Sequence, residues 1–292
     1  MPVSAMQPRK KFRIKAGNKN LDMGGRTLVM GILNVTPDSF SDRGQYMAPT
    51  AAVERAWKIA EEGADILDIG AESTRPGSRE VDAGEQLRRL MPVLENIGSR
   101  YPIPISIDTS NAEVARAVLQ NGASIINDVT SFRKDPRIGR EAADFNAAVV
   151  LMHMRGTPVN MQTLPPSPDI LGDIEVWAQE AVARAETSGV SSDKIILDPG
   201  IGFGKTAAQN FEILRNLDRL CAAGFPILVG TSRKSFIGST VNKSAGELVL
   251  GTGATVAASI VLGAHIVRVH DVAAMREIAD VADAIVGAGR HS

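Results

Sequence analysis

The sequence predicts a (β/α)₈ TIM barrel, and three observations support this fold class. About eight times along the chain, a short apolar run is followed by a helix-like segment. The runs are continuously apolar rather than alternating, as in parallel strands that are covered on both faces. Most runs end in polar residues, and a barrel brings such strand ends to one rim. These strand ends are Asn34, Asp68, Asp108, Asn127, His153, Asp198, Thr231 with Ser232, and Arg268 with His270.

An open, doubly wound parallel sheet is the main alternative fold. The barrel is favoured because the number of units is near eight and no Gly-x-Gly-x-x-Gly motif follows the first strand. No Pro/Ser-rich linker interrupts the alternation of apolar runs and helix-like segments. We therefore expect a single domain over residues 1–292, with residues 1–11 as a flexible extension.

The expected elements follow in chain order. Residues 12–15 and 21–23 predict a short β-hairpin that plugs one end of the barrel. The eight barrel strands are predicted at residues 28–33, 65–69, 103–107, 124–126, 147–152, 194–197, 226–229 and 265–269. Helices are predicted from Pro49 to Gly63, over 112–120, near 138–143, around 174–185 with Gly189 after the end, and over 248–262. Asp271 is expected to cap the last helix.

Composition narrows the class of protein. The 292 residues are 44% hydrophobic and carry a net charge of −1, so nothing indicates binding to nucleic acid or to an anionic membrane. Cys221 is the single cysteine, which excludes an intramolecular disulfide and indicates ordinary packing. The basic first 15 residues lack the apolar core of a secretory signal, and no run approaches the roughly 20 apolar residues of a membrane span. A cytoplasmic location is expected.

Three polar strand ends indicate a site for a flat, nitrogen-rich ring. Asp108, Asn127 and Asp198 would offer two carboxylates and an amide on one rim. The alternative is that each of these residues caps the helix after it, but Ser110 and Asp128 are better placed for that role.

Basic residues near the strand ends indicate a phosphate site on the same rim. Arg75, Lys234, Arg268 and His270 follow the second, seventh and eighth strands, and barrels often bind phosphate near strands seven and eight. A guanidinium fork with an ammonium suits phosphate or pyrophosphate, although the four charges could simply be solvated.

A glycine-rich segment follows the sixth strand. Asp198-Pro-Gly-Ile-Gly-Phe-Gly-Lys-Thr206 resembles a phosphate-binding P-loop but has Pro199 where that motif needs Gly. Its glycines are expected to let backbone approach a flat ring, with Phe203 beside it; a tight turn is the alternative. His153 is expected to be a hydrogen-bonded core residue rather than a metal ligand, and Met152 with Met154 could line an apolar slot or simply pack.

Eight segments, in order, resemble the signatures of the dihydropteroate synthase family. The first two are Met30-Gly-Ile-Leu-Asn-Val-Thr-Pro-Asp-Ser-Phe-Ser-Asp42 and Asp68-Ile-Gly-Ala-Glu-Ser-Thr-Arg-Pro-Gly77. The others lie at residues 106–110, 126–129, 151–154, 198–205, 232–235 and 268–272. The resemblance runs from the first strand to the last helix and implies the (β/α)₈ fold. It also implies a transferase that condenses 6-hydroxymethyl-7,8-dihydropterin diphosphate with p-aminobenzoate.

The resemblance further implies a role for each matching residue. Pterin binding falls to Asp108, Asn127, Asp198, Lys234, Met152, Phe203 and Gly202. Diphosphate binding falls to Asn34, Arg75, Arg268 and His270, with Asn34 also holding Mg²⁺. The p-aminobenzoate pocket comprises Phe40, Thr74, Pro76 and Ser235, and the long loops 34–48 and 70–82 are expected to close over it. Asp108, Lys234, Asn34 and Arg268 are expected to take part in an SN1-like reaction.

The chain departs from the usual family pattern at a few positions. Arg43 stands where Gly is common, Ala71 replaces a frequent Gly and Asn111 a frequent Lys. The chain also lacks the Phe-Gly insertion that is associated with sulfonamide-insensitive members of the family. Because Phe40, Thr74-Arg-Pro76 and Ser235 match the family, sulfonamides, which mimic p-aminobenzoate, are expected to inhibit. The alternatives are a corrinoid-dependent methyltetrahydrofolate methyltransferase and a non-catalytic pterin-binding paralogue. The family implies a homodimer, for which residues 254–262 are the candidate contact.

Overall fold

The computed structural model describes residues 9–36, 49–73, 77–78 and 80–287. Its strands are β1 (Phe12–Ala16), β2 (Lys19–Met23), β3 (Leu28–Asn34), β4 (Ile66–Gly70), β5 (Ile105–Asp108), β6 (Ile125–Asp128), β7 (Ala148–Met152), β8 (Ile195–Asp198), β9 (Leu228–Val229) and β10 (Ile266–Val269). Its α-helices are α1 (Pro49–Glu61), α2 (Ala83–Ile97), α3 (Ala112–Gln120), α4 (Arg137–Asp144), α5 (Ile170–Thr187), α6 (Ala207–Arg215), α7 (Leu217–Cys221), α8 (Ser235–Val241), α9 (Val249–Val261) and α10 (Val272–Ile285).

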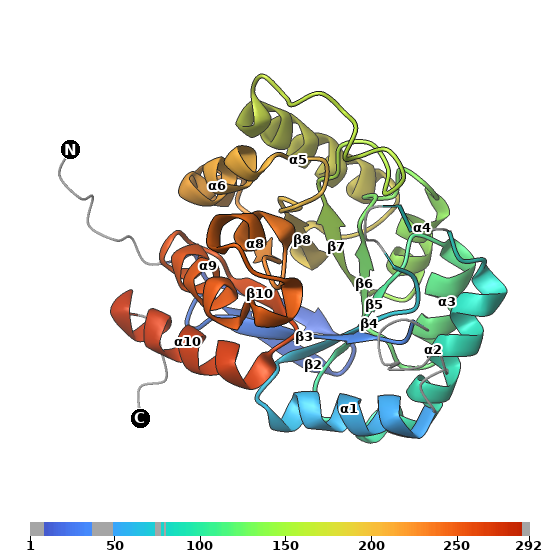
Figure 1. Ribbon diagram of the computed structural model, residues 1–292. Helices are drawn as coiled ribbons and strands as arrows, with labels where there is room; N and C mark the ends of the chain where they lie inside the picture. The colour runs from blue at the N-terminus through green and yellow to red at the C-terminus, as the bar shows by residue number, and fades with distance from the viewer. Residues whose placement is uncertain (1–8, 37–48, 74–76, 79, 288–292) are drawn as a thin grey trace.

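Eight parallel strands form the barrel, as the sequence predicts. Their order is β8-β7-β6-β5-β4-β3-β10-β9. A parallel bridge between Leu197 and Ile227 connects β8 to the segment before β9 and brings the two edges together. Figure 1 shows the helices arranged around these central strands. Every strand of the barrel therefore points the same way, and the residues at the ends of these strands share one rim.

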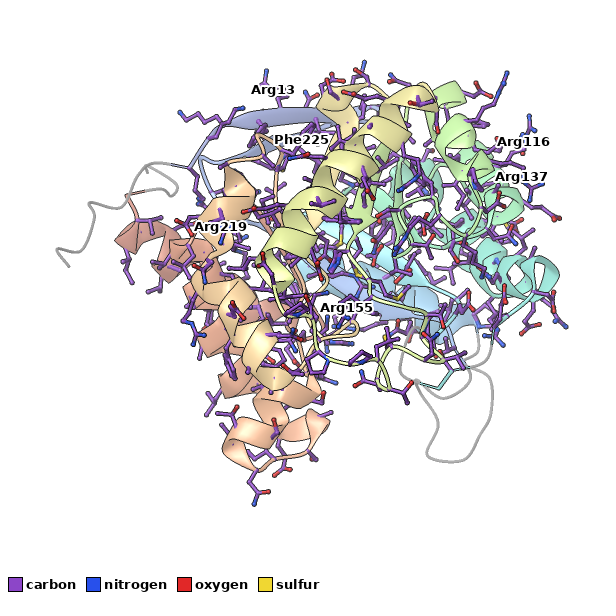
Figure 2. All side chains as sticks on the ribbon, turned by 90° about the horizontal axis from the view of Figure 1, so that it is seen from above. Arg13, Arg116, Arg137, Arg155, Arg219 and Phe225 are labelled. Atoms are coloured by element: carbon purple, nitrogen blue, oxygen red, sulfur yellow. The ribbon has the colours of Figure 1, made fainter. Side chains whose placement is uncertain are left out.

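The predicted hairpin is also confirmed. β1 pairs with β2 in antiparallel register, and its inward side chains Ile14, Ala16, Leu21 and Met23 are buried. They belong to a buried cluster with apolar side chains of the barrel strands, such as Met30 on β3. Figure 2 shows Arg13 of the hairpin at one end of the molecule and Arg155, which follows β7, toward the other. The hairpin thus covers the end of the barrel opposite the strand-end rim.

The helices pack on the outside of the strands through a second, larger apolar cluster. Gly31 on β3 shows how closely they approach. A Cβ added there would lie 2.5 Å from Ile59 Cγ2 of α1 and 2.9 Å from Val272 Cγ2 of α10. Only glycine lets both helices reach this strand, so the packing that fixes β3 also fixes the rim position of Asn34 at its end.

Three predictions about helix ends are wrong. Asp271 precedes α10 but makes no capping bond; its Oδ1 instead accepts from Arg233 Nη2 at 2.6 Å. Asn111, not Ser110, caps α3 by accepting from the backbone N–H of Glu113. The carboxylate of Asp128 caps no helix and holds a turn at the end of β6. Gly189 does follow the end of α5 with φ +94°, as predicted.

Two further features concern single elements. Cys221 ends α7 and packs, half-buried, against the outer apolar cluster, as predicted. Among the helices in the described part of the chain, none combines the length and the apolar content needed to cross a bilayer.

Candidate active site

Strand register places four residues in one row on the rim. Asn34 is the Cα partner of Gly70, Gly70 of Asp108, and Asp108 of Asn127, across β3 to β6. Gly70 lies between Asn34 and Asp108. A Cβ added to it would lie 3.4 Å from Asn34 Oδ1 and 3.7 Å from the Cβ of Asp108. The residues predicted from the strand ends are thus adjacent on this side of the rim.

A buried ionic cluster lies behind this row. Asp68 is fully buried on β4, and its Oδ2 accepts from Arg268 Nε at 2.6 Å and from Asn127 Nδ2 at 3.2 Å. Its Oδ1 accepts from Ser106 Oγ at 2.6 Å. Arg268 Nη2 also donates to Asp108 Oδ2 at 3.2 Å. Asp68 therefore connects a residue of the predicted ring site, Asn127, with a residue of the predicted phosphate site, Arg268.

The electrostatics of Asp108 follow from this cluster. Burial raises the pKa of the Asp108 carboxyl, the Arg268 charge lowers it in part, and the nearby Asp68 charge raises it again. A carboxylate in this position gains from any additional positive charge brought to the rim. Asp108 is thus suited to stabilise a cation that forms in the site.

The glycine-rich segment after β8 is a left-handed turn that only glycine can form at several positions. Gly200 and Gly204 have φ values of +64° and +67°. A Cβ at Gly200 would lie 1.9 Å from the carbonyl oxygen of His153, and one at Gly204 would lie 2.5 Å from that of Arg155. The turn therefore rests directly on the backbone that follows β7.

Asp198 and Lys234 face each other across this turn. The Asp198 Oδ1 accepts from Gly200 N–H at 2.7 Å. Burial raises the pKa of Asp198, and the charge of Lys234 lowers it in part. Lys234 Nζ donates to the carbonyl of Ile201 and lies 4.6 Å from the centre of the Phe203 ring. Burial lowers the pKa of Lys234 to about 8.

An apolar wall lies beside this pair. Met152, Met154, Met161 and Val129 form a small buried cluster, and Phe203 packs against it. A Cβ at Gly202 would lie 3.0 Å from Lys234 Cδ, so this glycine brings backbone close to the lysine stem. The predicted neighbours Met152, Phe203, Gly202 and Lys234 are therefore brought together.

His153 is a core residue, as predicted. Its side chain is buried, and burial lowers its pKa to about 2, so the ring is neutral. The ring meets that of Trp177 edge-on, with 5.5 Å between centroids. A hydrogen bond between the ring and the backbone carbonyl of Pro199 agrees with the expected bonded histidine, while Nδ1 has no hydrogen-bond partner.

The remaining predicted phosphate and pocket residues are only partly described. His270 N–H donates to Ser232 Oγ at 3.2 Å, which places this histidine beside the loop after β9. Ser235 is the first residue of α8. Phe40, Arg43, Thr74, Arg75 and Pro76 lie outside the described residues, as does most of the loop over residues 34–48.

Two buried charged side chains in this region received no role from the sequence. Asp68 has three side-chain donors around it, from Ser106, Asn127 and Arg268. Lys205 had no predicted role, although it is buried and donates to three carbonyl oxygens. For Asp68 the available signal was a lone charge inside an apolar run, because a buried charge needs a partner.

Comparisons with known proteins agree with this geometry. The family model described as pterin binding enzyme matches residues 30–270. A dihydropteroate synthase of Synechocystis sp. is 48% identical over 273 residues, which cover 93% of this chain and 94% of the relative. That of Escherichia coli K12 is 43% identical over 260 residues, covering 89% of this chain and 92% of the relative.

Solved structures give the same result. A Yersinia pestis dihydropteroate synthase in a sulfonamide drug complex matches with a TM-score of 0.90 and 40% identity, covering 95% of this chain and 100% of that one. A Xanthomonas albilineans dihydropteroate synthase with 4-aminobenzoic acid matches with a TM-score of 0.87 and 40% identity, covering 94% and 98%. The chain belongs to the dihydropteroate synthase family of pterin-binding enzymes.

Proposed function

We propose that this protein condenses 6-hydroxymethyl-7,8-dihydropterin diphosphate with p-aminobenzoate, releasing 7,8-dihydropteroate and pyrophosphate. The observation that carries the proposal is the rim, where Asp108 and Asn127 lie beside Arg268 in a chain of this family. Solved relatives are described with 4-aminobenzoic acid and with 7,8-dihydropteroate. One domain over residues 1–292 performs the whole reaction.

The pterin binds between the two carboxylates. Asp108 and Asp198 accept hydrogen bonds from ring and amino N–H groups, Asn127 supplies an amide, and Lys234 donates to the ring carbonyl. The buried Met152 and the ring of Phe203 provide apolar walls, and the absence of a side chain at Gly202 leaves room for the stem of Lys234. Most of the specificity then comes from buried polar groups that only a matching ring can satisfy.

The diphosphate binds at the other side of Asp108. Arg268, His270, Asn34 and Arg75 are assigned to this group. Among the described residues, no group of three or more His, Cys, Asp or Glu side chains could hold a metal. Mg²⁺ is usually held by one or two protein oxygens together with substrate phosphates. The Asn34 amide oxygen, beside Gly70, fits such a single ligand, and Mg²⁺ there would neutralise charge on the departing pyrophosphate.

The reaction is SN1-like. The bond between the pterin methylene carbon and the diphosphate oxygen breaks, and the electron pair leaves with pyrophosphate. Arg268 and His270 hold that anion, while Asp108 stabilises the carbocation that is delocalised into the pterin. The aryl amine then attacks the methylene and releases a proton. Positioning and electrostatics supply most of the rate, so closing loops that exclude water suit this chemistry.

The p-aminobenzoate pocket comprises Phe40, Thr74, Pro76 and Ser235. Only Ser235 belongs to the described residues. Since sulfonamides resemble p-aminobenzoate, we expect sulfamethoxazole to compete with it.

A pyrophosphate-release assay tests the proposed function. Release should require both substrates, and mass spectrometry should find 7,8-dihydropteroate. Protein that binds the pterin diphosphate without turnover would instead support a non-catalytic paralogue. Transfer of a methyl group from a methylated folate to a corrinoid protein would support the methyltransferase.

We also propose that the protein forms a homodimer through α9 and α10. Leu250 is 82% exposed, and the exposed residues Ala254, Ala258 and Val261 follow it at helical spacing. On the neighbouring α10, the side chains of Val281 and Ile285 are each 62% exposed. Analytical ultracentrifugation should find a dimer, and Leu250→Glu should shift it toward monomer. A monomeric wild type at micromolar concentration would contradict the proposal.

A further inference from the structure

Lys205 is a buried cation that the proposed reaction leaves without a role. It follows the glycine-rich turn, and its side chain is 8% exposed. Its Nζ donates to the carbonyl oxygens of Gly200 at 2.8 Å, Phe203 at 3.1 Å and His153 at 3.2 Å. An ammonium has three N–H donors, whereas a neutral amine has two. Three carbonyl acceptors therefore match the charged form of this lysine.

These three bonds join two loops. The carbonyl of His153 belongs to the segment after β7, whereas those of Gly200 and Phe203 belong to the turn after β8. The two segments touch so closely at Gly200 and Gly204 that no Cβ would fit. Arg155 Nη1 adds a bond to the Gly204 carbonyl at 3.3 Å. Lys205 lies at the centre of this contact and fixes the backbone that carries Phe203.

The direction of the side chain separates this segment from a P-loop. In a P-loop, the lysine after the glycines reaches the phosphates of a nucleotide. Here all three N–H groups of Lys205 point to main-chain carbonyls. Lys205 is consequently not available to bind a phosphate at this turn. The glycine backbone of the turn can instead contact an uncharged ring.

The buried position of Lys205 also affects the protonation of a nearby carboxyl group, that of Asp198. The positive charges of Lys234, Arg268 and Lys205 all lower the pKa of the buried Asp198 carboxyl. Burial lowers the pKa of the Lys205 ammonium well below its usual value, and the charge of Asp198 raises it in part, so each of these two residues favours the charged form of the other. Each positive charge that is removed should let Asp198 take up its proton at a higher pH.

We propose that Lys205 is a positioning residue, which acts through the turn after β8 and through Asp198 to build the pterin site. It holds Phe203 and the glycine backbone in place and helps keep Asp198 ionised. This inference rests on the proposed function of the rim, because it assumes that the pterin contacts Asp198.

The test measures binding of 6-hydroxymethylpterin by calorimetry between pH 5 and 8. Lys205→Met retains the alkyl stem without the charge, and Lys205→Gln retains N–H donors without the charge. Lys194→Met is the matched control, because Lys194 is also buried and donates its Nζ to the carbonyl of Lys15 near the hairpin. Circular dichroism establishes that each variant is folded.

We expect Lys205→Met to raise the pterin Kd at pH 7 by about tenfold, since unsatisfied buried carbonyls let the turn move. The pH at which affinity falls on the acid side should move up by about one unit in both Lys205 variants. Asp108 also titrates in this site, so the same comparison is made in an Asp198→Asn background, where the shift should vanish. Lys205→Gln should lose less affinity than Lys205→Met.

The proposal is overturned if both Lys205 variants keep the wild-type Kd and pH midpoint, or if Lys194→Met changes them equally. A shift that persists in the Asp198→Asn background would also overturn it. Failure of the proposed function is distinguishable, because the wild type would then release no pyrophosphate with both substrates and Asp198→Asn would not affect pterin binding.

Discussion

The two ends of the barrel contain the same kinds of buried charge but differ in how those charges are paired. At the hairpin end, Asp283 is 1% exposed and accepts from Arg9 and Thr27. At the rim, Asp68 accepts from Arg268, but that arginine is shared with Asp108. A buried ion pair is by itself weak evidence for function. An arginine shared between carboxylates occurs at both ends, because Arg276 contacts Asp65, Asp280 and Asp283 at the hairpin end. What distinguishes the rim is that its shared arginine contacts the strand-end carboxylate Asp108, beside the amide of Asn127.

The hairpin end also contains a cavity, of about 500 Å³, but no cluster of charged side chains converges among the described residues that line it, as one does at the rim. Asn18, Lys19, Tyr101 and Phe145 are among its lining residues. The Lys19 ammonium donates to the main-chain carbonyl of Tyr101 at 2.7 Å, so it is engaged in joining the hairpin to the barrel. Space alone therefore does not indicate the active site; converging polar side chains do.

The largest effect on catalysis should come from Asp108→Ala. If Asp108 stabilises the carbocation as we propose, loss of its carboxylate should lower kcat by about 100-fold or more, with a smaller change in KM. Steady-state pyrophosphate release measures both constants. An unchanged kcat would refute the role of Asp108 at the rim.

Arg268→Ala should act mainly on substrate binding. Charge-assisted hydrogen bonds to the diphosphate are worth about 1.5–3 kcal/mol, so KM for the pterin diphosphate should rise by roughly 10- to 100-fold. KM for p-aminobenzoate should change much less in the same assay. Equal effects on both substrates would indicate a general loss of structure instead.

The comparison between the two ends is sharpest for Asp68→Asn and Asp283→Asn. Removing one partner of a buried pair costs about 3 kcal/mol of unfolding free energy, so both variants should be destabilised in urea. Only Asp68→Asn should also lower kcat/KM, by roughly tenfold, because Asp68 orients Arg268 and Asn127. Equal catalytic losses in the two folded variants would remove the distinction.

A smaller effect concerns pH. Burial lowers the pKa of Lys234 to about 8, so its ammonium is present below that pH and is lost as the pH rises through it. Affinity for 6-hydroxymethylpterin should therefore fall severalfold above pH 8. The Lys234→Arg side chain stays charged over this range, so its affinity should not fall above pH 8 in this way. Comparing the two proteins also cancels any effect of titration of the ligand, because both bind the same pterin. Parallel pH curves for both proteins would contradict the assignment.

Much of the fold could be predicted from local pattern. Continuous apolar runs located all eight barrel strands, though β9 is shorter than predicted because only Leu228 and Val229 are in ladder register. Helix α2 received no prediction; Gly84 near its start and Pro92 inside it interrupt the helical pattern. The prediction that Asp271 caps the last helix was wrong because its carboxylate accepts a hydrogen bond from Arg233, a residue distant in sequence.

In the site, too, some residues could be predicted from local sequence and others could not. Asp108, Asn127 and Asp198 could be predicted because their position at strand ends is local information. The importance of Asp68 could not, because its main partner Arg268 is 200 residues away. The role of Lys205 depends on main-chain carbonyls, which sequence does not place in space.

A crystal structure with 6-hydroxymethylpterin, pyrophosphate and Mg²⁺ would show whether the strand-end rim is the substrate site. We expect a ring that contacts Asp108, Asn127 and Asp198 beside Phe203, and a pyrophosphate on Arg268 and His270. Arg268 should remain bonded to Asp68. A ring that touches none of the three strand-end residues, or ligands bound at the hairpin end, would refute the assignment of the site to the rim.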